Sequence, residues 1–101
     1  MSLNLKAITS AMGYQQLTGL TVATRLTVPT RDVNGLSVKP AIAIITCETA
    51  GVRWRDDKIA PTATVGMPMS AGVTLQYDGD LNSIQFIQQS AGAVVNVSYY
   101  A

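Results

Sequence analysis

The chain has 101 residues, of which 48% are apolar and only 13% are charged, with a formal net charge of +1. This length suits one domain with one core, and the near-neutral charge lacks the basic stripe that nucleic-acid binding requires. Histidine is absent and cysteine occurs once, which excludes an intrachain disulfide and leaves no ligand set for zinc. So few charges also predict that another protein chain covers part of the apolar surface, in a homodimer, a homotrimer or a larger assembly.

The first fourteen residues differ from the rest of the chain. Leu5, Ile8 and Met12 follow one another at helical spacing, and Gly13 would end a helix. Residues 1–14 are therefore predicted to form a short helix or an extended arm that crosses to a neighbouring subunit. Because they lack the pattern of a signal peptide, and because no apolar run is long enough to span a bilayer, we expect a soluble protein made in the cytoplasm with no membrane partner.

From residue 15 onward the apolar residues alternate with a period of two, which is the pattern of β-strands. A half-buried strand ending at Pro29 is predicted because one face collects Leu20, Val22, Leu26 and Val28. Asn34-Gly35 predicts a tight hairpin turn. Residues 40–48 are apolar on both faces and predict a central strand that is covered on both sides.

The second half of the chain continues this alternation. Residues 52–55 predict a short strand and residues 58–71 a long connection. Three further strands, separated by turns at Asp78-Gly79 and Ala91-Gly92, predict an antiparallel meander. Together the patterns predict an all-β fold, in which residues 15–101 form a compact, jelly-roll-like antiparallel β-sandwich or a partly closed barrel.

One stretch gathers charge around the only tryptophan, Trp54. Its interface candidates are Arg53, Arg55, Asp56 and Asp57. In one interpretation Trp54 anchors the core, and the charged residues form ion pairs within the chain or with a partner. Alternation favours this interpretation, since Val52 and Trp54 share a face.

The alternative is that Trp54 is exposed and stacks on a sugar or a base. The broad indole face suits this task. The other residues that could take part in stacking are Tyr77, Tyr99 and Tyr100.

The residue inventory argues against an enzyme. Without histidine, the commonest general base and the usual partner of a serine or cysteine nucleophile are missing. The adjacent Asp56 and Asp57 would point to opposite faces of a strand and could not share a proton. Asp78 and Asp80 could contribute to a calcium site, but a hairpin turn explains them more simply. We therefore expect no catalytic residue, no metal and no cofactor.

Five runs in residues 50–101 carry a resemblance to known proteins: Val-Arg-Trp-Arg-Asp-Asp, Pro-Thr-Ala-Thr-Val-Gly, Tyr-Asp-Gly-Asp-Leu, Ile-Gln-Phe-Ile and Val-Ser-Tyr-Tyr. Through them this half resembles the C-terminal portion of small virion-associated proteins of tailed bacteriophages. The resemblance implies a non-enzymatic virion component, in the first place a capsid decoration or cement protein that binds across major capsid subunits. The alternative it leaves open is a neck, tail or fibre component. The stacking interpretation of Trp54, Tyr77, Tyr99 and Tyr100 would give such a component a carbohydrate-binding role.

Overall fold

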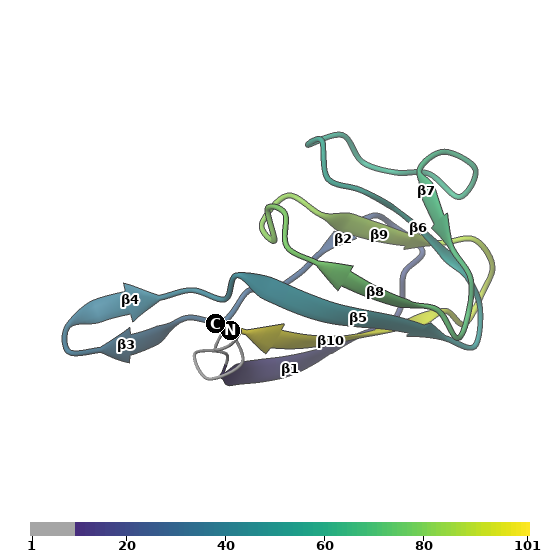
Figure 1. Cartoon of the computed structure of the whole chain (residues 1–101). Coiled ribbons are helices and arrows are strands. Elements are labelled where there is room, and N and C mark those ends of the chain that lie inside the picture. The colour runs from purple at the N-terminus through teal and green to yellow at the C-terminus, as the bar shows by residue number, and fades with distance from the viewer. Residues whose placement is uncertain (1–9) are drawn as a thin grey trace, which may run out of the picture.

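The computed structural model describes residues 10–101, and they form β-strands and no helix (Figure 1). This confirms the predicted all-β class. None of these residues belongs to a helix that could cross a membrane. The strands are β1 (Ala11–Leu17), β2 (Thr24–Arg25), β3 (Arg31–Val33), β4 (Leu36–Val38), β5 (Ile42–Glu48), β6 (Val52–Arg55), β7 (Met67–Met69), β8 (Thr74–Tyr77), β9 (Gln85–Gln88) and β10 (Val94–Tyr100).

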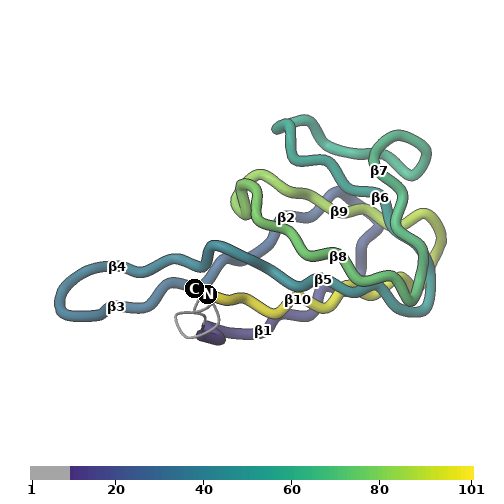
Figure 2. Tube along the Cα trace, viewed as in Figure 1, coloured from purple at the N-terminus to yellow at the C-terminus, as the bar shows by residue number. Residues whose placement is uncertain are grey.

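Eight of the ten strands form two four-stranded sheets, and every neighbouring pair is antiparallel. Sheet A has the order β1-β10-β5-β8, and sheet B has the order β2-β9-β6-β7. The remaining strands, β3 and β4, pair only with each other. Their hairpin extends away from the rest of the molecule (Figure 2).

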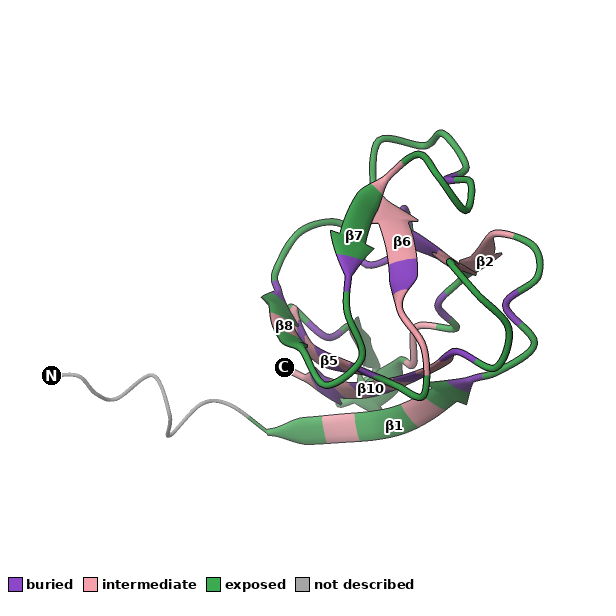
Figure 3. Cartoon of the chain, turned by 90° about the vertical axis from the view of Figure 1, so that its right-hand side faces the viewer, coloured by how far each residue is buried: buried purple, intermediate pink, exposed green. Residues whose placement is uncertain are grey.

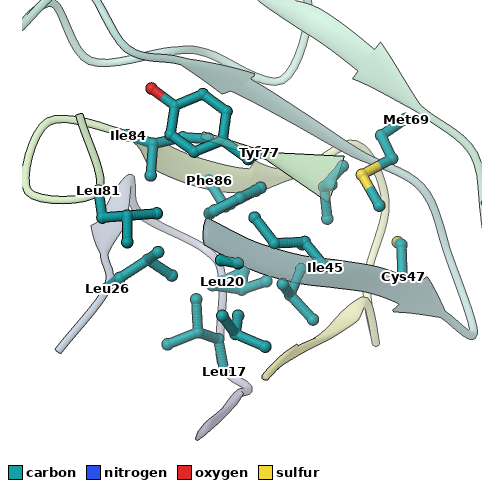
Figure 4. Close-up of a cluster of buried hydrophobic side chains, with 14 of the residues drawn as sticks. Leu17, Leu20, Leu26, Ile45, Cys47, Met69, Tyr77, Leu81, Ile84 and Phe86 are labelled. Atoms are coloured by element: carbon teal, nitrogen blue, oxygen red, sulfur yellow. The ribbon is translucent and has the colours of Figure 1, made fainter. Parts of the chain in front are cut away.

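One hydrophobic core takes side chains from both sheets (Figure 4). In the two central strands of sheet A every second residue is buried, as the period of a strand requires. These residues are Ala43, Ile45 and Cys47 on β5, and Val95, Val97 and Tyr99 on β10. Sheet B contributes Val52, Met69 and Phe86 to the same cluster.

The hairpin predicted at Asn34-Gly35 is confirmed. Asn34 has a φ of 52° and Gly35 a φ of 79°, which are the left-handed values of a type I′ turn. Residues 42–48 do form a central strand, between β10 and β8. The prediction that both faces of this strand are covered is wrong, because Ile42, Ile44 and Thr46 are only half-buried.

The predicted antiparallel meander is wrong. β8 pairs with β5 in sheet A, β9 pairs with β6 and β2 in sheet B, and β10 returns to sheet A. The chain therefore changes sheet at each of the two predicted turns. Alternation predicted the strands but not their partners, because a strand with one buried face has the same pattern in either sheet.

The N-terminal part of the chain also differs from expectation. Residues 11–14 belong to β1, which pairs with β10, so the helical alternative for the N-terminal arm is wrong there. The rest of that prediction falls on residues 1–9, outside the described residues.

The strand predicted before Pro29 is reduced to β2. Leu20 and Leu26 are buried on either side of it, and Val22 is 66% exposed.

Candidate functional site

A hollow on the described part of the chain lies between the end of β6, the connection that follows it and the start of β7. Its volume is about 380 Å³. We call it the Trp54 groove, and it is lined by Trp54, Arg55, Asp56, Asp57, Val65, Gly66 and Met67. The charged residues that surround Trp54 in the sequence thus contribute to the lining of this groove.

Trp54 is half-buried, so that it takes part in both the core and the groove. It packs against the core cluster. The ring of Tyr77 meets it nearly edge-on, with the centroids 6.0 Å apart and the planes at 70°. This geometry is favourable for an aromatic pair and fixes the indole without stacking a second ring parallel to it.

Arg53 holds the connection between β6 and β7 in place. Its Nε donates a hydrogen bond to the carbonyl oxygen of Ala63 at 3.2 Å, and its Nη1 donates to that of Gly66 at 2.8 Å. Gly66 has a φ of 142°, and a Cβ there would lie 3.2 Å from Pro61 and from Arg53. One wall of the groove is therefore a backbone segment attached to β6.

Arg55 forms a two-pronged ion pair with Asp57 inside the groove. Nε donates to Oδ1 at 3.0 Å and Nη2 donates to Oδ2 at 2.5 Å. The hydrogen bonds to Arg55 lower the pKa of the Asp57 carboxyl below its ordinary value. Because both side chains remain partly exposed, the pair orients two polar groups more than it stabilises the fold.

Asp56 has a different partner from Asp57. Its Oδ2 accepts a hydrogen bond of 2.7 Å from the hydroxyl of Tyr77. Burial of Tyr77, followed by this bond to Asp56, raises the pKa of the hydroxyl far above its usual range. The four charged interface candidates thus have partners within the chain: Asp57 for Arg55, Tyr77 for Asp56 and two carbonyl oxygens for Arg53.

The four aromatic residues considered for stacking do not form one site. Trp54 and Tyr77 meet, but Tyr77 is only 7% exposed. Tyr99 is 1% exposed and donates a hydrogen bond of 2.7 Å to Oε1 of Gln15, so it offers no face to a ligand. Tyr100 lies at a second hollow of about 250 Å³, with Ile42, Ile44 and Gln76.

The turn after β8 is built by Asp80. This carboxylate accepts hydrogen bonds from the hydroxyl of Ser83 at 2.7 Å and from the amide of Asn82 at 3.0 Å, which lower its pKa. Residues 10–101 contain no group of three or more side chains of the kinds that could hold a metal ion. These contacts favour the turn interpretation of Asp78 and Asp80.

A second surface was not predicted, namely the face of sheet A that points away from the core. We call it the outer face of sheet A, and it is formed by Tyr14, Gln16, Ile42, Ile44, Thr46, Glu48, Thr74, Gln76, Val94, Asn96, Ser98 and Tyr100. Glu48, at the end of β5, is the only charged residue in these four strands. The lack of charge in each segment was visible in the sequence, but the pairing that joins the segments was not.

Two buried tyrosine hydroxyls are expected to make the fold less stable in alkaline solution. Burial raises the pKa of Tyr99 to about 12, and the pKa of Tyr77 is also raised. Unfolded tyrosines ionise near their ordinary pKa of about 10, so the unfolded state loses its protons first. The contribution of the two protonated tyrosines to the free energy of unfolding is complete below pH ~10. Above this pH it is lost, by up to about 1.4 kcal/mol per tyrosine per pH unit. Urea unfolding above pH ~10 should show a shallower decline for Tyr99→Phe than for the wild type; parallel declines would contradict the raised pKa.

Substituting Gly79 by alanine is expected to destabilise the fold by about 1–3 kcal/mol. A Cβ at Gly79 would lie 2.6 Å from Cζ of Tyr77, and the Tyr77 hydroxyl is held by Asp56. The ring must therefore move, and with it the contact to Trp54. Gly13→Ala is the matched control, because its Cβ would meet Pro29 at an ordinary 3.6 Å. Equal unfolding free energies for the two variants would show that Tyr77 is not confined.

The groove and the outer face of sheet A differ in chemistry. The groove combines a half-buried indole with an ion pair and a second carboxylate, whereas the outer face carries hydroxyl, amide and aliphatic groups. Comparisons with protein-family models, with curated proteins and with solved structures found no match to this chain.

Proposed function

We propose that the chain is a non-enzymatic structural protein of a bacteriophage virion, a capsid decoration or cement protein that binds across major capsid subunits. The observation that carries this proposal is the outer face of sheet A, on which Glu48, at one end of β5, is the only charged residue. Protein interfaces are depleted of charge at their centre and enriched in tyrosine, and a solvated sheet face ordinarily carries charges. The remaining charged residues of the described chain lie outside these four strands.

The details of this face support a role in binding. Tyr14 is 65% exposed, and its hydroxyl donates a hydrogen bond to Oδ1 of Asn96, which also accepts from Gln16 at 3.0 Å. Ser98 donates to the hydroxyl of Tyr100 at 3.1 Å. Figure 3 shows that most of β1, the strand that carries Tyr14 and Gln16, is exposed. Ordering of these polar groups before binding reduces the entropy that association costs.

The proposal extends to the fold, as a β-sandwich of the jelly-roll type. If the β3–β4 hairpin is left out and the other eight strands are numbered 1 to 8 along the chain, the spatial order in sheet A is 1-8-3-6. The order in sheet B is 2-7-4-5. This is the order expected when an antiparallel chain is wound as two Greek keys. Jelly rolls are common in viral capsid and lectin domains, so this strand order supports the proposed function.

The proposed partners are a second copy of the chain and the major capsid protein, and the proposed location is the virion, after synthesis in the host cytoplasm. A dimer and a trimer both fit, and threefold positions of a shell favour the trimer. The mechanism is mass action, because a protein that binds only the assembled shell stabilises it.

The test is the resistance of capsid shells to heat and pressure, with and without the purified protein. We expect shells that lack the protein to break at lower temperature and pressure, and added protein to restore the resistance. Equal resistance in both preparations would contradict cementing.

A second candidate is a neck, tail or fibre component with a carbohydrate-binding role, which the Trp54 groove favours. Immunogold labelling of intact virions separates it from cementing. Label on the tail alone supports the second candidate, and label over the whole capsid supports the first.

A further inference from the structure

We infer that the Trp54 groove binds a neutral saccharide, with one pyranose ring seated on Trp54 and its hydroxyl groups bound by Arg55, Asp56 and Asp57. The inference gives the second candidate function a site and a ligand class. It does not depend on cementing, because the groove is formed by sheet B and its connection while the proposed capsid surface belongs to sheet A.

The groove has apolar lining residues that suit the C–H face of a sugar ring. Trp54 and Met67 are neighbours in the β6–β7 pairing, and Val65 lies close to them along the chain. Val65 is 53% exposed and Met67 is 56% exposed, so that large apolar side chains remain in water beside a half-buried indole. A ligand with an apolar face would remove this surface from water.

The polar rim offers donors and acceptors side by side. Arg55 uses two of its five N–H groups on Asp57 and keeps the others. Oδ1 of Asp56 is left to accept a hydrogen bond, because Tyr77 occupies only Oδ2. Neighbouring hydroxyl groups of a sugar each donate and accept, and they match such a rim.

The charge balance of the groove disfavours an anionic ligand. Arg55 and Asp57 neutralise each other, and Asp56 adds a second carboxylate. A phosphate group or a nucleotide would meet two carboxylates. A purely apolar ligand would remove water from the ion pair without replacing its hydrogen bonds, which is costly. The volume of about 380 Å³ is that of a small-molecule site.

The only tryptophan of the chain is a built-in reporter of this groove. The full chain is titrated with methyl glycosides of glucose, galactose, mannose and N-acetylglucosamine, and with their oligosaccharides, while tryptophan emission is recorded. We expect a saturable change for at least one sugar, with a dissociation constant on the order of 1 mM for a single ring. Arg55→Ala and Asp57→Ala should each weaken binding about tenfold or more, which is the loss expected for a hydrogen bond to a charged group.

Arg31→Ala, on the β3–β4 hairpin, is the matched control and should leave the affinity within about twofold, as expected of a surface change away from the site. Circular dichroism verifies that the variants are folded. The inference is overturned if no sugar changes the emission up to its solubility limit, if Arg55→Ala and Asp57→Ala bind as well as the wild type, or if only nucleotides or apolar ligands bind. None of these results would alter the heat resistance of decorated shells, so failure here is distinguishable from failure of the capsid proposal.

Discussion

Substitution of Ile44 by aspartate is expected to weaken binding to capsid shells by about 100-fold or more, which corresponds to ~2.7 kcal/mol. Ile44 lies on a central strand of sheet A, between Ser98 on β10 and Gln76 on β8, and its side chain belongs to the outer face. A carboxylate there would lose its water on binding and would find no cation among the residues of that face. The buried side chains of β5 are unchanged, so the fold should persist.

Cosedimentation of the purified protein with shells measures this loss. Val22→Asp is the matched control, since Val22 is 66% exposed and lies outside sheet A. Its affinity for shells should equal that of the wild type. If Ile44→Asp and Val22→Asp bind equally well, the outer face of sheet A is not the docking surface.

Truncation of Phe86 to alanine is expected to lower the unfolding free energy by about 3–5 kcal/mol. Phe86 is fully buried, its strand lies between β2 and β6, and its ring packs in the core that both sheets share (Figure 4). The loss combines the apolar surface that is no longer buried with the cavity that remains. It is a large share of the ~5–15 kcal/mol that stabilises a typical domain.

Urea unfolding provides the measurement, with the midpoint lowered and the slope m unchanged. Ile59→Ala is the control, because Ile59 is 56% exposed and its truncation should cost less than about 0.5 kcal/mol. A Phe86→Ala variant as stable as Ile59→Ala would contradict the single shared core.

Local features of the fold were predictable because short segments determine them. Asn34-Gly35 specifies its turn through two left-handed residues, and the alternation along β5 and β10 specifies which side chains are buried. The pairing of strands was not predictable in this way. The sequence between β8 and β9 reads as an ordinary hairpin turn, and yet it crosses between the sheets.

Part of the Trp54 groove could also be predicted from the sequence, because some of its residues lie close together along the chain. The charged residues around Trp54 are adjacent in sequence, and the pairing of Arg55 with Asp57 follows from their proximity. The partners of Arg53 are carbonyl oxygens, which have no sequence signature. The contact of Asp56 with Tyr77 spans 21 residues and depends on the placement of β8 against β6.

A cryo-electron microscopy map of the intact virion tests the central claim most directly. We expect density for this chain on the capsid, across neighbouring capsid subunits, with the outer face of sheet A against the shell and the Trp54 groove open to solvent. Density confined to the neck, tail or fibres, or a capsid-bound chain whose sheet A outer face points to solvent, would contradict it.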